Sequence, residues 1–354
     1  MMNSPIIIDE KNGWFSRKGA SDDVVIASRV RLSRNINGFL YPGKMEQKDE
    51  DAVSASIKSA FEKIDTEDLW RGSEIGKLNP LDRKILLERN HLTQDFILHS
   101  NKSIVLSKDN LSSCAVNDTD HLRMSFFEGG LSIKECADRA DELDRKIEKH
   151  LDFAVSFEFG YLNTEVNNLG TGMKASVMMH LPALVKANLI EKALKAVVQI
   201  GFTVKGFMGD DDHSLGSMYQ ISNQFTIGHS EAEIVDKLQN LCTQIAEYER
   251  KAREEMFQKK RTEIEDSVFR AYGLLTNCRI LSSNEAIENL SMLRMGIGLG
   301  LIDLPIEVCS SLIFLSQKSH IQKMIKDGES RADEMLVDFT RADFIKNTII
   351  QKKL

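Results

Sequence analysis

Apolar and polar residues alternate through VVIASRVRLSRN, Val24 to Asn35, which is typical of a half-buried β-strand. On such a strand Arg29, Arg31 and Ser33 share one face, whereas Val30 points to the other. The backbone positions of Arg29 and Arg31 would lie roughly 6–7 Å apart, a spacing at which two guanidinium groups suit an oligophosphate. A solvated strand face explains the same pattern, and the stretch alone leaves both interpretations open.

Short strands and helices are mixed up to Ser230. Asn79 and Pro80 predict the N-cap and first position of a helix through LDRKILLERNHL, and the charged stretch 131–151 predicts an amphipathic helix. A further helix is expected from Pro182 to about Ile200. Strand-like runs recur without a regular strand–helix–strand rhythm: SIVLS, CAVND, HLRMSFF, ASVMMHL, FTVKGFM and MYQISNQFTI. This mixture favours an α+β domain with an antiparallel sheet.

The pattern becomes almost entirely helical from Ser230 onwards. Ser230 and Glu233 predict a capping box, and no glycine or proline follows until Gly273. We therefore expect two domains, a mixed catalytic-type domain at 1–254 and an all-helical domain at 255–354.

Composition narrows the class of protein. The 354 residues carry a formal net charge of −7, which argues against a protein that binds nucleic acid through backbone charge. No apolar run is long enough to span a membrane, and no secretory signal is expected. The five cysteines include no CxxC pair, which predicts neither a disulfide framework nor a zinc ribbon. These features predict a cytoplasmic protein.

Four further stretches place charged groups near strand ends or in loops. VNDTDHLRM carries acidic residues before His121 and Arg123, NNLGTGMKASVMMHLPAL runs from a glycine loop into Lys174, and VKGFMGDDDHSLG has three consecutive aspartates. His91 follows the helix that begins at Pro80. Each stretch alone has an ordinary explanation as a turn, a solvated loop or a packed histidine.

Taken together, these motifs resemble one family. ASRVRLSRN, NDTDHLR, NLGTGMKASVMMHLPAL and KGFMGDDDHSLGSMYQISNQ have the order and spacing found in the ATP:guanidino phosphotransferases, or phosphagen kinases. GWFSRKGASDDVVIASRVRLSRN and FRAYGLLTNCRILSSNEA resemble the bacterial protein-arginine kinases among them. The resemblance implies a phosphagen-kinase fold followed by a helical domain. It also implies ATP-dependent phosphorylation of protein arginine side chains in a stress response that marks proteins for proteolysis.

The resemblance also implies an ATP site without a glycine-lysine P-loop. Phosphoryl transfer depends mainly on positioning and on neutralising charge, which several converging cations provide. Mg²⁺ would be held by phosphates and water, so no protein metal ligands are expected. Arg34 is expected to be structural. The phosphate-binding positions are Arg29, Arg31, Arg123, Lys174 and Lys205, and the other nucleotide positions are Ser28, Val30, His91, Ser176, Val177 and Met178.

The catalytic positions depart from the family pattern. Thr119 replaces the glutamate that holds and deprotonates the guanidinium, and threonine cannot accept that proton at neutral pH. Asp210 replaces the second catalytic glutamate, and Glu165 replaces a cysteine beside the substrate. Lys174 and Lys205 replace two phosphate-binding arginines. We hypothesise that Glu165, with Asp210, supplies the carboxylate that Thr119 lacks.

These departures leave two functions open. Losing a general base lowers the rate by about 10²–10⁴, and an arginine-to-lysine change removes bidentate geometry. The chain is therefore expected to be a protein-arginine kinase or, alternatively, a weakened or dead pseudokinase that acts as a nucleotide-binding scaffold. A kinase for small guanidines is less favoured, because the separate N-terminal helical domain of those enzymes is not found in this sequence.

Partners and regulation follow from the same resemblance. Expected partners are proteins with exposed arginines, a zinc-binding activator, a Clp-type protease and a second copy in a homodimer, but neither nucleic acid nor a membrane. Protein-arginine kinases carry an R-D-x-x-R-A motif that binds phosphoarginine, and this chain reads VDFTRA at 337–342. Because the leading arginine is lost, phosphoarginine regulation is in doubt.

Overall fold

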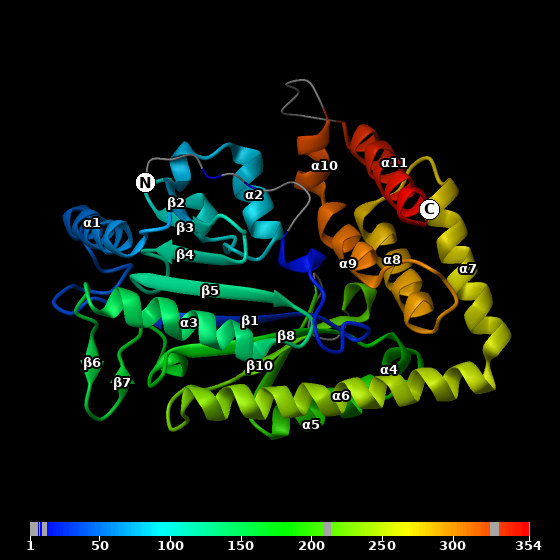
Figure 1. The fold of residues 1–354 in the computed structure, drawn as a ribbon, viewed down its shortest axis with the longest axis horizontal. Coiled ribbons are helices and arrows are strands. Elements are labelled where there is room, and N and C mark those ends of the chain that lie inside the picture. The colour runs from blue at the N-terminus through cyan, green and yellow to red at the C-terminus, as the bar shows by residue number, and fades with distance from the viewer. Residues whose placement is uncertain (1–5, 7, 9–12, 208–213, 326–332, 354) are drawn as a thin grey trace.

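The computed structural model describes residues 6, 8, 13–207, 214–325 and 333–353. Within them, eight antiparallel strands form one sheet with the order β2–β3–β4–β5–β1–β8–β10–β9 (Figure 1). The strands are β1 (Val25–Arg34), β2 (Trp70–Glu74), β3 (Ser103–Ser107), β4 (Ser112–Val116), β5 (Leu122–Gly129), β8 (Met173–His180), β9 (Phe202–Gly206) and β10 (Met218–Asn223). A separate hairpin consists of β6 (Val155–Ser156) and β7 (Gly160–Tyr161).

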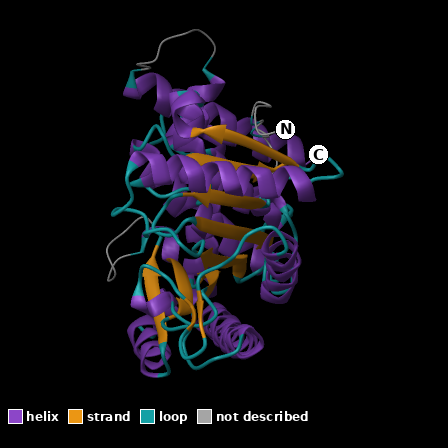
Figure 2. Ribbon diagram, turned by 90° about the vertical axis from the view of Figure 1, so that its left-hand side faces the viewer, coloured by secondary structure: helices purple, strands orange, loops and turns teal. Residues whose placement is uncertain are grey.

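Helices surround this sheet, whose strands follow one another down the molecule in Figure 2. The first group is interspersed with the strands: α1 (Gln47–Ile64), α2 (Pro80–Glu88), α3 (Ile133–Glu148), α4 (Pro182–Lys186) and α5 (Ile190–Gln199). The second group follows the sheet: α6 (Glu231–Lys259), α7 (Arg261–Asn277), α8 (Ser283–Gly298), α9 (Ile306–Leu315), α10 (Lys318–Met324) and α11 (Glu334–Lys353). The predicted α+β architecture with an antiparallel sheet and a helical C-terminal region is therefore confirmed.

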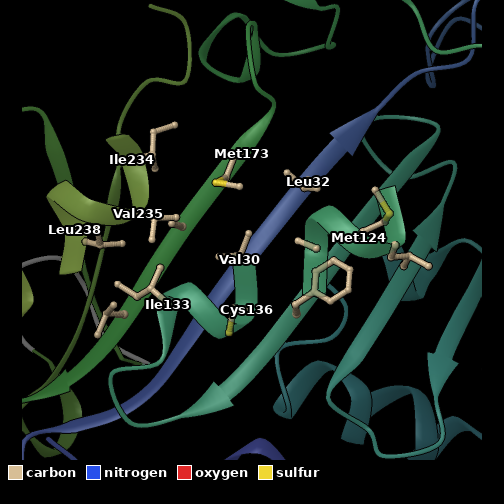
Figure 3. Close-up of a cluster of buried hydrophobic side chains, with 14 of the residues drawn as sticks. Val30, Leu32, Met124, Ile133, Cys136, Met173, Ile234, Val235 and Leu238 are labelled. Atoms are coloured by element: carbon tan, nitrogen blue, oxygen red, sulfur yellow. The ribbon is translucent and has the colours of Figure 1, made fainter. Parts of the chain in front are cut away.

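One face of the sheet is apolar and covered by α3 and α6. Figure 3 shows side chains from both helices lying over the central strands. Val30 of β1 is fully buried there, as are Met124 of β5 and Ile133 of α3. Burying apolar side chains on this face fixes the register of the strands, because a one-residue slip would reverse both faces. The opposite face is consequently the one left for polar chemistry.

The opposite face carries two features, the predicted phosphate-binding cations and an aromatic contact with the helical region. Trp14 stacks on Phe127 of β5 at 5.7 Å between ring centroids and meets the edge of Phe314 of α9 at 4.5 Å. The Trp14 indole N–H donates to Arg89 O at 3.0 Å. The segment before β1 thus joins the sheet to the helical region at one end of this face.

The local predictions agree with the structure except in two helices. The helix predicted through LDRKILLERNHL ends earlier, at Glu88, and Asn90 beyond it has φ +60°. Asn79 caps α2, accepting a bond from Leu81 N, and Ser230 and Glu233 form the expected capping box of α6. The single helix predicted over 182–200 is wrong, because the chain forms α4 and α5 instead. Asn188 between them has φ +56°, a left-handed conformation that ends α4. The predicted division at 254/255 falls within the continuous helix α6 and stays a prediction.

Candidate active site

The register of four strands brings the predicted phosphate-binding cations to one face. Arg31 of β1 lies opposite Lys174 of β8, while Arg123 of β5 pairs with Ser33, two residues further along β1. Lys205 of β9 reaches the same face through β10. Directly paired residues in a sheet point to the same side, so these positive side chains and Arg29 converge. We call these five residues (Arg29, Arg31, Arg123, Lys174 and Lys205) the cation cluster.

The cation cluster is crowded enough to disfavour its own charge. Burial and then the neighbouring Arg123 lower the pKa of Arg31 to about 10. Burial, followed by repulsion from Arg31 and Arg123, lowers the pKa of Arg29 well below its ordinary value. Burial, then Arg31 and Lys205, also lowers the pKa of Lys174. Like charges held together in this way create a strong attraction for a multivalent anion.

Individual contacts orient the cations. Arg29 Nε donates to Ser176 Oγ at 3.2 Å, and its guanidinium lies 5.8 Å from the centroid of the Phe127 ring. Arg123 Nη1 lies 2.5 Å from Asp118 Oδ2, and the Asp118 side chain is buried. Asp118 therefore supplies one internal counter-charge next to the cluster.

A small pocket adjoins Arg29 on the same face. Its lining joins apolar surface to polar groups, as small-molecule sites commonly do. The lining includes three of the predicted nucleotide positions, Ser28, Ser176 and Met178, although Ser28 Oγ is turned away and donates to Gly130 O at 2.8 Å. The remaining lining residues are Trp14, Ala27, Asn90, Phe127 and Gln220.

Four predicted nucleotide positions do not present their side chains to this face. Ser28 is one of them, because it pairs with Val177 and its Oγ accepts a bond from Ser132 N at the start of α3 at 2.9 Å. Val30 and Val177 are fully buried in the core beneath α3 and α6, so only their backbone could contribute. His91 is buried behind Phe127 with ring centroids 4.9 Å apart, and its Nδ1 lies 3.1 Å from Ser113 Oγ. Burial, followed by the charge of Arg89, lowers the pKa of His91 to about 3. His91 therefore supports the pocket wall as a neutral ring.

The substituted catalytic positions lie beside one another. Thr164 Oγ1 donates to Thr119 O at 2.6 Å, and Thr164 N donates to Asp120 Oδ1 at 2.8 Å. Glu165 follows directly and is exposed, as is Thr119. Burial lowers the pKa values of Arg31 and Lys174, and the charge of Glu165 acts in the opposite direction on both. The Glu165 carboxylate is therefore close enough to the cation cluster to interact with it electrostatically. Asp210 lies outside the described residues.

Glycine and arginine fix the loop between Glu165 and Lys174. Gly172 has φ +64°, and a Cβ there would meet Ser33 O at 2.7 Å. Arg34 Nη1 donates to Thr171 O at 2.9 Å, while Arg34 Nη2 pairs with Asp144 of α3 at 2.6 Å. The predicted structural role of Arg34 is confirmed by these buried contacts.

The VDFTRA stretch forms part of α11. Arg341 is only 2% exposed and donates to Ser316 O at 2.8 Å and to Leu281 O at 2.7 Å, and it pairs with Asp338. These contacts join α11 to the neighbouring segments of the helical region. Arg341 is thus already engaged in holding that region together.

Sequence reasoning missed five pocket residues and one carboxylate. The pocket residues come from separate elements, and only the tertiary fold brings them together: Trp14, Ala27, Asn90, Phe127 and Gln220. Asp118 lies within the NDTDHLR motif, but its contact with Arg123 can be recognised only in the folded structure. Among the described residues, no helix is long and apolar enough to cross a membrane, and no group of three or more acidic, histidine or cysteine side chains could hold a metal.

Comparisons with known proteins agree with this geometry. The model of the "ATP:guanido phosphotransferase, C-terminal catalytic domain" matches residues 52–252, and that of the "Protein-arginine kinase McsB C-terminal domain" matches residues 261–353. The chain is 37% identical over 316 residues to a protein-arginine kinase of Pelotomaculum thermopropionicum, covering 88% of this chain and 89% of that one. It is 33% identical over 346 residues to the protein-arginine kinase of Bacillus subtilis, covering 97% and 94%.

Solved structures show the same fold at lower identity. A lombricine kinase matches with a TM-score of 0.58 and 21% identity, covering 68% of this chain and 70% of that one. The duplicated taurocyamine kinase of Schistosoma mansoni matches with a TM-score of 0.59 and 23% identity, covering 70% of this chain and 36% of that chain. The chain therefore belongs to the ATP:guanido phosphotransferase family and, within it, to the protein-arginine kinases.

Proposed function

We propose that this protein transfers the γ-phosphoryl group of ATP to arginine side chains of proteins. The observation that carries the proposal is the cation cluster, in which side chains from β1, β5, β8 and β9 converge beside a small pocket lined by apolar and polar residues. Its like charges lower the pKa values of Arg29, Arg31 and Lys174, so a bound triphosphate would relieve the repulsion between them. The names of the similar proteins support the arginine acceptor.

The chemistry requires a group that accepts a proton. As a guanidinium nitrogen of the substrate bonds to the γ-phosphorus, the bond from that phosphorus to the β–γ bridging oxygen breaks and ADP leaves. The attacking nitrogen loses a proton in the process. Glu165 is suited to hold the guanidinium and receive that proton. It follows Thr164, which is hydrogen-bonded to Thr119, and its charge acts on Arg31. Asp210 is the second candidate carboxylate.

ATP would supply the phosphoryl group, and Mg²⁺ would balance its charge through phosphate oxygens and water. The chain's own cations would neutralise the rest of the charge. Lys174 and Lys205 provide charge without the planar fork of arginine, so they would bind phosphate as point charges. Arg29 and Arg31 keep the bidentate geometry.

A pseudokinase is the second candidate, and Thr119 is the observation that favours it. Its side chain has no carboxylate, while the cation cluster and the pocket that would bind nucleotide are present. Such a protein would bind ATP or ADP as a scaffold and form no phosphoarginine. Regulated proteolysis through a zinc-binding activator and a Clp-type protease, and assembly as a homodimer, are proposals that fit either candidate.

Phosphoarginine detection separates the two candidates. The full chain is incubated with Mg-ATP and a panel of unfolded, arginine-rich proteins, and acid-labile phosphate is measured. An active kinase forms phosphoarginine that disappears in the Arg29→Ala/Arg31→Ala variant. Nucleotide binding without any phosphoarginine would reject the kinase in favour of the scaffold.

A further inference from the structure

The β6–β7 hairpin exposes large apolar side chains to solvent. Relative exposure is 57% for Val155, 110% for Phe157 and 42% for Phe159, and Val166, just beyond the hairpin, is 75% exposed. Figure 1 shows the hairpin reaching away from the body of the sheet next to α3. We call these four residues the hairpin patch. Apolar side chains gathered on one exposed element commonly mark an interaction site.

Hydrogen bonds and ring contacts order the hairpin at its tip and at its base, so its exposed side chains are held in place. Ser156 Oγ accepts bonds from the backbone N–H groups of Glu158 at 3.2 Å and Phe159 at 3.4 Å, which orders the tip. At the base, the Tyr161 hydroxyl lies 3.2 Å from Glu148 of α3, and the Arg34 guanidinium lies 3.6 Å from the Tyr161 ring centroid. The anchored base and ordered tip present the two phenylalanines at little further entropic cost on binding.

The same hairpin is joined to the candidate catalytic loop. Tyr161 N donates to Gly170 O at 2.8 Å, and Asn163 Nδ2 donates to Asn168 O at 2.7 Å. Glu165 and Val166 lie in the segment that these two hydrogen bonds enclose. Phe157 and Phe159 precede Glu165 by eight and six residues, a span of at most roughly 20–28 Å of extended chain. One extended polypeptide can therefore reach both the hairpin patch and the cation cluster.

Charge favours a polypeptide that contains arginine as the occupant. Glu158 lies at the tip between the two phenylalanines, and Glu165 directly precedes Val166 and interacts electrostatically with Arg31 and Lys174. These carboxylates attract a basic segment and repel an anionic lipid surface. Folded proteins bury most of their large apolar side chains, whereas unfolded segments offer them to a partner.

We propose that the hairpin patch binds apolar side chains of the polypeptide whose arginine enters the active site. The preferred substrate is then an unfolded or flexible segment with an aromatic or aliphatic residue within about eight extended residues of the target arginine. This inference rests on the proposed function, because it names the substrate class of the same site.

Peptide binding tests the inference without relying on phosphate transfer. Two labelled peptides of about 17 residues, each with one central arginine, are compared by fluorescence anisotropy. One peptide carries phenylalanines about six to eight residues to either side of the arginine, and the other carries serines at those positions. The wild-type chain should bind the phenylalanine peptide roughly tenfold more tightly, as expected for burying aromatic side chains. Phe157→Ser/Phe159→Ser should remove this preference, whereas the matched control Phe269→Ser, at a residue 51% exposed on α7, should keep it.

Each outcome decides the inference. Equal affinity of the wild type for both peptides, or an undiminished preference in the double variant, would overturn it. So would a wild-type dimer that dissociates in the double variant, since the hairpin patch would then bind a second copy. Thermal unfolding checks that the variants are folded. A hairpin-dependent preference without phosphoarginine formation would defeat the proposed function alone, and phosphoarginine formation without that preference would defeat only this inference.

Discussion

Arg294 of α8 lies 3.1 Å from His180 at the end of β8, with Arg294 Nη1 facing His180 Nδ1. The other ring nitrogen, Nε2, lies 2.8 Å from Ser291 Oγ. The same guanidinium donates to the backbone oxygens of Asp22 and of Asp23, the latter at 3.0 Å. His180 ends the strand that carries Lys174, and the two aspartates precede the strand that carries Arg29 and Arg31. One buried side chain of the helical region thus ties the ends of both strands.

Arg294→Ala should destabilise the protein strongly. The substitution removes the donor to Asp22 O and to His180 Nδ1 and one of the two arginine donors to Asp23 O, which keeps its bond from Arg253. Each buried group left without a partner costs about 1–3 kcal/mol. We expect the free energy of unfolding in urea to fall by about 3 kcal/mol or more. Arg270→Ala, whose side chain is 79% exposed in a pair with Asp266, is the control and should change little. Equal stabilities of the two variants would contradict this role of Arg294.

Buried histidines should make the fold sensitive to acid. Burial lowers the pKa of His91 to about 3 and also lowers the pKa values of His121, His180 and His320. The unfolded chain binds protons near pH 6.5, where the folded chain does not, so stability is complete above that pH and is lost as pH falls toward the folded values. Each neutral histidine then contributes a slope of about 1.4 kcal/mol per pH unit.

His91→Gln is the variant that checks the acid sensitivity. Urea denaturation between neutral pH and about pH 5 should show a shallower loss of stability than in wild type, by about one proton. The glutamine retains a polar group for Ser113, so folding at neutral pH should be preserved. An unchanged slope would mean that His91 does not stay neutral in the folded protein.

Local patterns predicted most of the sheet because strand alternation and helix caps are encoded by neighbouring residues. Arg29 and Arg31 alternate with buried Val30, and this alternation alone indicated β1 and its polar face. The break between α4 and α5 was missed because it depends on Asn188 adopting positive φ, which asparagine tolerates but does not require. The strand order could not be read from periodicity, since it depends on long-range pairing.

The active site was predictable only as far as short motifs reached. Motifs identified Arg123 and Lys174 as members of one site, and the register placed them on one face. Other residues that line the pocket beside Arg29, such as Trp14 and Gln220, belong to elements far apart in sequence and are not part of any recognised motif. Val177 was named with its neighbours, but strand alternation turns its side chain into the core.

Nucleotide should stabilise the wild-type protein through the cation cluster. Binding only to the folded state adds about 2.7 kcal/mol at a nucleotide concentration one hundred times Kd, so Mg-ADP should raise Tm. Arg29→Ala/Arg31→Ala should abolish this shift. The unliganded variant should unfold at the same temperature or higher, because burial and repulsion already disfavour both charges, as their lowered pKa values indicate.

Differential scanning fluorimetry with and without Mg-ADP measures both effects. Arg145→Ala, at a side chain 75% exposed on α3, serves as the control and should keep the full shift. A double variant that still responds to Mg-ADP like the wild type would show that phosphate binds elsewhere.

Thr119→Glu should raise phosphoarginine formation if the missing carboxylate limits an otherwise intact site. The position is exposed, and the bond from Thr164 uses the backbone oxygen of Thr119, so a glutamate fits without disturbing the loop. The expected gain is about tenfold or more, within the range of general-base effects of about 10²–10⁴. Thr119→Gln is the matched control and should give no gain. A lower rate in the glutamate variant would indicate that another carboxylate already fills that space.

Glu165→Gln should lower the yield of phosphoarginine while leaving nucleotide affinity unchanged. The substitution preserves the shape of the side chain and can still accept the Asn168 Nδ2 bond, which spans 3.3 Å. It removes the charge that counteracts the lowering of the Arg31 and Lys174 pKa values. A neutral amide neither holds a guanidinium by ionic pairing nor accepts its proton, so the loss should approach that of a general base, about 10²–10⁴.

Single-turnover assays of Glu165→Gln with saturating Mg-ATP separate chemistry from nucleotide binding. Glu191→Gln, at a carboxylate 84% exposed on α5, is the control and should keep the rate of phosphate transfer. If Glu165 only balances charge in the cation cluster, its substitution would weaken or strengthen Mg-ADP binding and leave the rate of phosphate transfer unchanged. A reduced rate at unaltered Mg-ADP affinity places the Glu165 carboxylate on the substrate arginine.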